Sequence, residues 1–278
     1  MSVLRLLTVY NERDIIRENI EYYISQGIET VVLDNYSKDG TYEILKEYEG
    51  KGIRWIERYK SKFYDIVKIN TILLRLAFKE PEKYFIWIDA DEILTLFDER
   101  LPLKLTIIKL FSIFDVDCFS ASKIEFYHTE KSKILEEKNY SFKDFNYFIF
   151  ERNWKNVVFK KDFRIRTYVD KPYYIDENNK EIPHKVQKDI FFLKHYPFRT
   201  YRQAKKKVYR GLPLNNSPNA LNAHYRYFKE NMLDKIVRPK ETLIRYENYP
   251  FFLADFMTKS YPELTSFYDK LYEKLLGG

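Results

Sequence analysis

The chain has 278 residues, of which 45% are hydrophobic and 18% aromatic, and its formal net charge is +7. This length and composition suit one large core, or one domain with an appendage, and they exclude a disordered chain. Seven glycines and the absence of GxGxxG and GxxxxGK[ST] exclude the usual signatures of a dinucleotide-binding fold and of a P-loop.

The cysteine content and the hydropathy pattern bear on location. Cys118 is the only cysteine, so an internal disulfide and a CxxC zinc site are excluded, and a reducing compartment fits. The apolar stretch 107–119 contains Lys109 and Asp115 and is too short to span a membrane. Acidic residues follow the N-terminus too early for a signal peptide. We therefore expect a cytoplasmic protein, soluble or peripheral at the inner face of the membrane.

Strands and helices alternate through the first ninety residues. Residues 3–9 are apolar enough for a buried strand, and residues 11–27 form an amphipathic helix that Gly27 ends. The next predicted elements are a strand at 29–35, a helix at 37–50, a strand at 53–59, a helix at 63–78 and a strand at 84–89. Such alternation predicts an α/β fold with a mostly parallel sheet, right-handed crossovers and flanking helices.

Three of these strands run directly into polar residues. Residues 10–12 follow the first strand, residues 34–40 follow the second, and residues 89–92 follow the fourth. Ligands of parallel sheets bind beyond the carboxyl ends of the strands. The three clusters are therefore predicted to line one crevice, although Asp39 is better explained as a cap of the helix that follows it.

The second half of the chain is less regular. We predict a strand at 116–128, a loop over the crevice at 129–150, a hairpin at 157–169 and a strand that ends at His195. A basic helix follows, with Thr200 as N-cap, Gln203 as its capping-box partner and Gly211 as its stop.

The predicted domain organisation has two parts. Residues 1–211 form the catalytic domain, with a nucleotide-binding half at about 1–95 and an acceptor half at about 96–211. Residues 212–278 form a mostly helical C-terminal extension. Its aromatic segment 248–276 is expected to pack on the domain rather than contact a membrane or a partner.

The carboxylates after the fourth strand point to a metal. Asp89 and Asp91 flank one small residue, so both side chains share a face of an extended segment and repel each other. A divalent cation removes this repulsion, and oxygen ligands suit Mg²⁺ or Mn²⁺, which also bind substrate phosphate. The alternative is a solvated strand end. The buried strand before the pair and the two other clusters favour a site.

Three ordered segments, TVYNERD, VVLDNYSKDGT and WIDADEIL, resemble the family 2 glycosyltransferases. The closest branch carries DN-x-S-x-D-G-T and D-x-D-E, and KHYPFRTYRQAKKKVYRG is similar to its later His-Tyr segment with a basic helix. The resemblance implies a Rossmann-like GT-A fold, a UDP- or GDP-linked sugar donor and a Mn²⁺ or Mg²⁺ cofactor. It implies inverting hexosyl transfer to a glycan, a lipid-linked or a protein acceptor.

The resemblance assigns the nucleotide contacts to the first two clusters. Thr8, Tyr10 and Glu12 match the first nucleotide-contacting motif, and Asp34 and Asn35 match the pair that faces the base. Many family members have two aspartates at the latter pair. Because the amide of Asn35 both donates and accepts hydrogen bonds, the identity of the base stays open.

The resemblance assigns the metal to the third cluster and the His-Tyr segment. Asp89 matches the carboxylate near the ribose, and Asp91 matches the direct metal ligand. Glu92 is expected behind them, orienting Asp91 or a lysine. His195 is the further metal ligand, with His184 as its rival.

The basic helix suits phosphate. Arg199 and Arg202 lie near its N-terminus, which favours an anion, and Lys206 is one turn beyond Arg202. We expect these arginines to contact the donor diphosphate. The remaining cations are either solvated or in contact with anionic lipid headgroups.

Inverting transfer requires a base for the acceptor hydroxyl. Asp89 and Asp91 are counted with the catalytic residues, and Glu151, Asp162 and Asp170 are the candidate bases. Two other functions were weighed. A nucleotidyltransferase would usually show a glycine-rich loop with a lysine, which is absent here. A basic module for membrane or nucleic acid leaves the acidic clusters unexplained, so we expect no nucleic acid partner.

Overall fold

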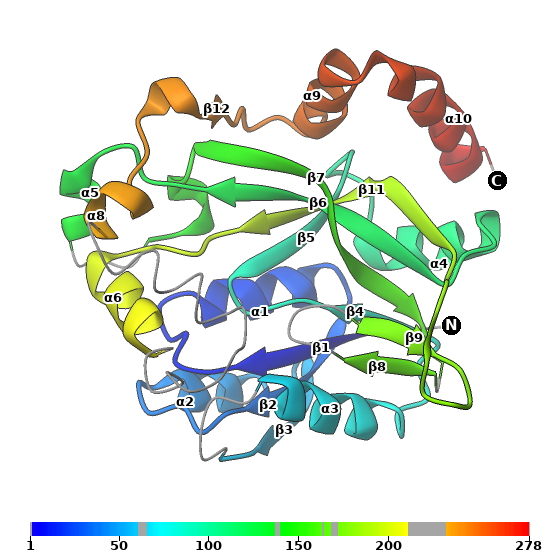
Figure 1. Cartoon of the computed structure of the whole chain (residues 1–278), viewed down its shortest axis with the longest axis horizontal. Helices are drawn as coiled ribbons and strands as arrows, with labels where there is room; N and C mark the ends of the chain where they lie inside the picture. Colours follow the sequence, from blue (N-terminus) through cyan, green and yellow to red (C-terminus); the bar gives the residue numbers. More distant parts are fainter. Residues whose placement is uncertain are drawn as a thin grey trace.

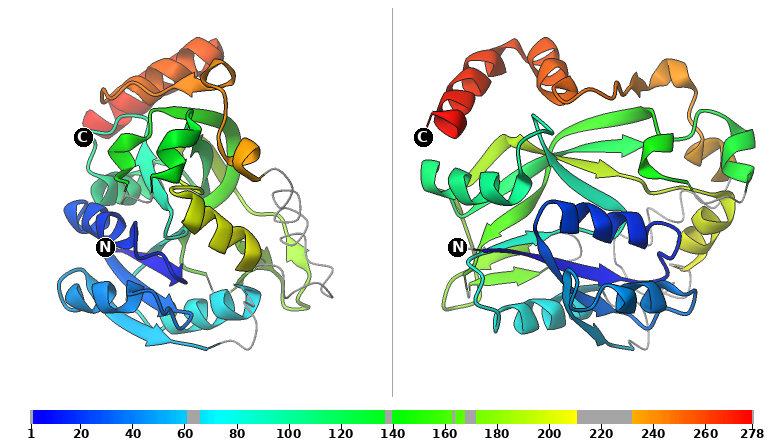
Figure 2. Two further views of the ribbon diagram at one scale, coloured as in Figure 1. Left: turned by 90° about the vertical axis from the view of Figure 1, so that its left-hand side faces the viewer. Right: turned by 180° about the vertical axis from the view of Figure 1, so that it is seen from behind.

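The computed structural model describes residues 2–60, 66–136, 140–162, 164–167, 172–210 and 232–277. Its main sheet lies between layers of helices, with the C-terminal helices along one side (Figures 1 and 2). Within the described residues, that sheet consists of β1 (Val3–Val9), β2 (Glu29–Asp34), β3 (Ile53–Arg58), β4 (Tyr84–Trp87), β5 (Glu92–Leu96), β6 (Cys118–Phe126), β7 (Tyr147–Lys160), β11 (Val186–His195) and β12 (Ile244–Arg245).

The strand order is β3-β2-β1-β4-β7-β6-β11-β5, and β12 pairs with β7. The first four of these strands are mutually parallel, as the alternating pattern predicts. In the second half, β7 is antiparallel to β4 and β6, while β11 is parallel to β6 and antiparallel to β5. The predicted α/β fold, with a parallel sheet flanked by helices and a helical C-terminal part, is confirmed.

The described helices are α1 (Ile16–Ser25), α2 (Thr41–Glu47), α3 (Ile66–Ala77), α4 (Leu103–Ile113), α5 (Lys131–Leu135), α6 (Tyr201–Arg210), α8 (Met232–Ile236), α9 (Phe252–Ser260) and α10 (Thr265–Leu276). Alternate residues of β1 face opposite sides of the sheet. Leu4 and Leu6 pack with α3, whereas Leu7 and Val9 pack with α1 and α2. Both faces are covered, which explains why apolar residues lie on both sides of the strand.

Two predictions for the middle of the chain need correction. The hairpin at 157–169 is wrong, because β7 continues as a 14-residue strand between β4 and β6, and β8 (Ile165–Thr167) pairs instead with β9 (Pro172–Ile175). β9 also pairs with β10 (Glu181–Ile182) to complete a small separate sheet. The other correction is β5, which was not predicted because its apolar residues follow the acidic cluster without a turn signal.

The C-terminal helices share the core of the main sheet. Leu253, Met257 and Leu271 are buried in the same cluster as residues of α4, β6 and β11. The phenol of Tyr246 donates to Glu99, and Lys194 contacts both groups, so the segment before α9 is also fastened to the sheet. The expectation that this aromatic segment packs on the domain is confirmed. No described helix is long and apolar enough to cross a membrane.

Candidate active site

The three polar clusters meet at one edge of the sheet. Asp34 pairs with Val9 across β2 and β1, and β4 lies on the other side of β1. The segments after these parallel strands therefore emerge together, as predicted. β11 brings His195 to the same place, because His195 pairs with Glu92 of β5 and with Glu125 of β6.

Asp91 is the centre of this cluster. It is buried, and one carboxylate oxygen, Oδ2, faces three cationic side chains. They are Lys207 in direct hydrogen-bond contact, His195 Nε2 at 3.6 Å and Arg199 Nη1 at 3.9 Å. Burial alone would raise the pKa of Asp91, but the charges of Lys207 and His195 outweigh it and hold that pKa well below its usual range. Asp91 is therefore an anion already neutralised by the protein.

His195 is oriented by two carboxylates. Its Nδ1 lies 2.9 Å from Glu125 Oε2, which leaves Nε2 facing Asp91. Burial lowers the pKa of His195, but the hydrogen bonds and charges of Asp91 and Glu125 raise it to about 9. A carboxylate behind one imidazole nitrogen is the usual way in which a protein fixes a metal-binding histidine.

Glu92 holds the turn between the two aspartates. It is buried, both its oxygens accept from Lys155 Nζ at 2.7 Å, and Oε2 also accepts from the backbone N–H of Asp89 at 2.9 Å. The side chain of Asp89 remains 55% exposed, 3.8 Å from Lys155. Glu92 therefore orients a lysine and the turn, while Asp89 is left accessible to a ligand.

The first loop is tied to the His-Tyr segment by Arg199. This side chain is only 1% exposed, and its guanidinium donates to Glu12, to both oxygens of Asp14 and to the carbonyl of Tyr196. These contacts occupy the groups that were expected to reach the nucleotide and the diphosphate. Contact of Glu12 with the nucleotide and of Arg199 with the diphosphate stays a prediction.

The carboxylate of Asp34, the last residue of β2, also has protein partners. Asp34 is fully buried, accepts from the backbone N–H of Ser37 and pairs with Arg58 Nε at 3.0 Å. The Arg58 guanidinium lies between the rings of Tyr36 and Tyr42, 4.2 and 4.0 Å from their centroids. The side chain of Tyr36 is exposed, so an accessible aromatic ring lies beside the ion pair of Arg58 and Asp34.

The remaining predicted nucleotide contacts line the same edge. Thr8 and Asn35 are buried, and Tyr10 is half-buried at the start of the first loop. Asp39 contacts the start of α2, because its Oδ1 accepts from the backbone N–H of Thr41 at 3.0 Å, while the N-cap position itself is Gly40. Direct contact of Thr8, Tyr10 and Asn35 with a nucleotide stays a prediction.

The candidate bases separate in space. Glu151 on β7 is exposed and pairs with Lys123 at 3.2 Å, and Lys123 also lies 3.1 Å from Glu125, the partner of His195. Asp162 follows the end of β7 that pairs with the beginning of β4, so it lies at the opposite edge of the sheet. Asp170 lies outside the described residues. Glu151 is the described candidate that is connected to the cluster.

His184 does not compete with His195. It stands before β11, whereas His195 ends that strand, and ten residues of strand span about 30 Å. The Nε2 of His184 lies 3.0 Å from Asn156 Nδ2 instead. Of the two histidines, only His195 reaches Asp91.

The geometry of Asp91 and His195 fits a divalent cation. Mg²⁺ needs about 2.1 Å to each ligand, so adjacent ligands lie about 3 Å apart, near the observed 3.6 Å. No group of three or more His, Cys, Asp or Glu side chains in the described ranges is placed to hold a metal. Two protein ligands suffice when diphosphate oxygens and water complete the shell. Lys207 now contacts the same carboxylate oxygen.

Residues 6–101 match the family model described as glycosyl transferase family 2. This segment belongs to that family. It runs from β1 past β5 and includes the turn with Asp89, Asp91 and Glu92, so the predicted resemblance is confirmed. No curated protein matches the chain.

Several solved structures match most of the chain at low sequence identity. TarS from S. aureus matches 83% of it at 13% identity with a TM-score of 0.43, and the chain spans 44% of TarS. TarS 1–349 in complex with UDP-GlcNAc matches 81% at 11% identity and a TM-score of 0.42, with 69% of that chain covered. The mannosyltransferase PcManGT from Pyrobaculum calidifontis, in complex with GDP-Man and Mn²⁺, matches 82% of the chain at 14% identity with a TM-score of 0.37. The match covers 70% of the PcManGT chain.

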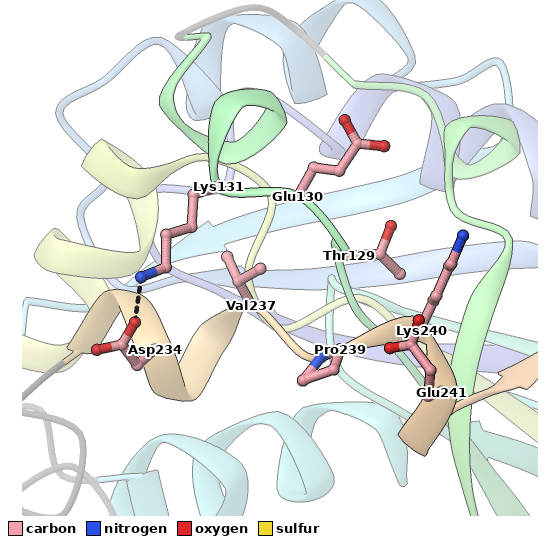
Figure 3. A pocket seen from close by; sticks show the side chains of 8 residues that line it. All are labelled: Thr129, Glu130, Lys131, Asp234, Val237, Pro239, Lys240 and Glu241. Atoms are coloured by element: carbon pink, nitrogen blue, oxygen red, sulfur yellow. Dashed lines mark ion pairs between the residues drawn. The ribbon is translucent and has the colours of Figure 1, made fainter.

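A cavity of about 560 Å³ lies outside the family 2 segment (Figure 3). It opens between the loop before α5 and the C-terminal extension, and the ion pair of Lys131 with Asp234 stands at one side. Thr129 of its lining follows His128, whose Nε2 is 2.8 Å from the carbonyl oxygen of Arg199. The C-terminal extension therefore lines one side of this cavity. The loop on the other side follows His128, which contacts Arg199 of the cluster.

Three residues of the cluster were missed from the sequence. Glu125 is a carboxylate within strand β6, and Lys155 is a buried lysine within β7. Lys207 stands seven residues after the cap at Thr200, so helical periodicity places it two turns along from that end. Both strands carry other polar residues, so the local pattern does not single out these two charges, and strand pairing is needed to name their partners.

Proposed function

We propose that the protein is a glycosyltransferase that moves a hexosyl unit from a nucleoside diphosphate-sugar, UDP- or GDP-linked, to an acceptor hydroxyl. The observation that carries the proposal is the convergence of Asp91, from the family 2 segment, with His195, from outside it. Both side chains are held by partners that leave one oxygen and one nitrogen directed at each other.

The protein groups divide into three roles. Asp91 and His195 hold Mn²⁺ or Mg²⁺, which when bound neutralises charge on the departing diphosphate. Asp89 is exposed beside them and is assigned to the ribose side of the donor. Arg202, exposed on the first turn of α6, is assigned to the diphosphate.

Glu151 is our candidate for the base. Its carboxylate is exposed, and Lys123 joins it to Glu125 and therefore to the strand that carries His195. An exposed carboxylate at this point can take the proton of an acceptor hydroxyl as that oxygen attacks the anomeric carbon, which inverts the configuration. The acceptor classes are a glycan, a lipid-linked sugar or a protein, and the basic face of α6 suits anionic headgroups.

The test is a melting-temperature measurement on the full chain with a nucleoside diphosphate, Mn²⁺ or Mg²⁺, and both together. We expect UDP or GDP to raise the melting temperature only with the metal, because the diphosphate completes the metal's ligand shell. Asp91→Asn should abolish the joint effect, whereas Asp162→Asn, at the opposite sheet edge, should retain it. The absence of a shift with every nucleotide and metal would contradict the proposal.

A further inference from the structure

Lys207 is a charged group at the site for which neither the family 2 segment nor the proposed reaction gives a role. It lies outside residues 6–101, on α6, and its ammonium donates to Asp91 Oδ2. That oxygen is the one that faces His195 Nε2 at 3.6 Å. The ammonium is thus in contact with the atom that a divalent cation would have to bind.

Arg199, another cation beside Asp91, is more deeply buried than Lys207. The guanidinium of Arg199 is held by Glu12, Asp14 and a backbone carbonyl, and its side chain is 1% exposed. The Lys207 side chain is 14% exposed and ends a flexible four-carbon stem, with the carbonyl of Pro197 3.5 Å from its nitrogen. Lys207 is therefore the more accessible of these two cations, and its ammonium is the one in direct contact with Asp91 Oδ2.

A divalent ion on Asp91 and an ammonium on the same oxygen repel each other strongly in a buried site. We propose that Lys207 is a resident cation that neutralises Asp91 in the metal-free protein and moves to the donor diphosphate when the metal binds. This inference rests on the proposed function, because the diphosphate is the anion that arrives with the metal. It deepens that proposal by naming a further diphosphate-binding residue.

The proposal predicts that removal of the Lys207 ammonium changes two affinities in opposite directions. Removal of the ammonium eliminates a competitor for Asp91, so Mn²⁺ alone should bind more tightly. It also removes a positive charge from the diphosphate, so a nucleoside diphosphate should bind the Mn²⁺-loaded protein more weakly. A residue with only a structural role would weaken both or change neither.

The experiment measures Mn²⁺ binding to the full chain by the loss of the free-ion EPR signal, first without and then with UDP or GDP. For Lys207→Met we expect Mn²⁺ alone to bind at least about tenfold more tightly than to the unaltered protein. We expect the nucleotide to bind the Mn²⁺-loaded variant about tenfold more weakly. Lys207→Arg, which retains the charge, should stay within about threefold of the unaltered protein for Mn²⁺.

Lys206→Met is the matched control, because Lys206 is the exposed neighbour on the same helix. It should change neither affinity, and circular dichroism should show that all three variants fold. Equal Mn²⁺ affinity in Lys207→Met and the unaltered protein would overturn the resident-cation inference while leaving the proposed function standing. Failure of both proteins to bind Mn²⁺ would overturn the metal site itself.

Discussion

At the scale of single residues, the site is a balance of buried charge. Asp91 and Glu125 are the anions, and His195 stands between them with a pKa raised to about 9 despite its burial. Removing one member of a buried charged group leaves its partners uncompensated, which costs more than the interaction itself contributes. The same side chains therefore serve both the stability of the metal-free protein and its proposed function.

This balance predicts a pH dependence of stability for the metal-free protein. The pKa of His195 is raised from 6.5 to about 9 on folding, so its protonated form stabilises the folded state. That contribution is complete below about pH 6.5 and is lost as the pH rises through about 9. In EDTA, the free energy of unfolding should exceed that of His195→Gln by up to about 3 kcal/mol at pH 6, and by much less at pH 9.5.

Urea denaturation of both proteins across this range measures the difference. The two unfolding curves should approach each other as the pH rises. A difference that is constant from pH 6 to pH 9.5 would contradict the idea that the charge of His195 stabilises the fold.

At the scale of elements, the positions where strands end and helices begin determine where the site residues lie. Thr200 caps α6 by accepting from the backbone N–H of Gln203 at 3.1 Å, as predicted, while Gln203 Oε1 accepts from Arg199 N–H rather than from Thr200. This cap sets where α6 begins, and so where Lys207 lies relative to Asp91. The predicted stop at Gly211 lies outside the described residues.

The turn between α2 and β3 allows a matched test of element packing. Gly50 and Gly52 both have positive φ, at +76° and +130°. A Cβ on Gly50 would meet nothing within 4 Å, whereas one on Gly52 would lie 2.3 Å from Cγ1 of Ile24 in α1. Gly50→Ala should cost about 1–2 kcal/mol of unfolding free energy from backbone strain alone.

Gly52→Ala should cost more, about 3 kcal/mol or above, because overpacking of α1 adds to the backbone strain. Thermal and urea denaturation of the two variants give the comparison directly. Equal costs would mean that α1 moves away from the turn without penalty, contrary to the close contact of Gly52 with Ile24.

At the scale of the whole molecule, the C-terminal extension is part of the main core. The ring of Tyr268 stacks on Phe97 at 4.9 Å, and α10 also packs on α4. The division into a domain of 1–211 and an extension of 212–278 stays a prediction about the chain's organisation. Its described part is nonetheless bound to the sheet through shared apolar contacts.

Two leucines of α10 test this packing. Leu271 is buried, whereas Leu276 is 68% exposed. Leu271→Ala should lower the unfolding free energy by about 2–5 kcal/mol, and Leu276→Ala should change it by less than about 0.5 kcal/mol. The melting temperature of each variant measures the effect, and truncation after Arg238 should reduce soluble yield. A neutral Leu271→Ala variant would show that α10 does not stabilise the domain.

Features that depend on neighbouring residues could be predicted from the sequence alone. The alternation of apolar strands and amphipathic helices determined the parallel half of the sheet, because periodicity reflects which faces are buried. The position of Asp89, Asp91 and Glu92 directly after a buried strand determined that they reach the crevice edge. His195 could be proposed because it ends an apolar strand before a capped basic helix.

Which of these groups come into contact depends on how the strands pair in the folded protein. The pairing of β11 with β5 and β6 brings His195 to Asp91 and Glu125, and no local pattern reports a contact between residues seventy or more positions apart. The same pairing separates His184 from the site. The burial of Arg199 against Glu12 and Asp14 likewise joins residues that are 187 and 185 positions apart in the chain. The charge of each side chain follows from the sequence. Whether that charge is neutralised depends on its distance from opposite charges, and the folded structure determines those distances.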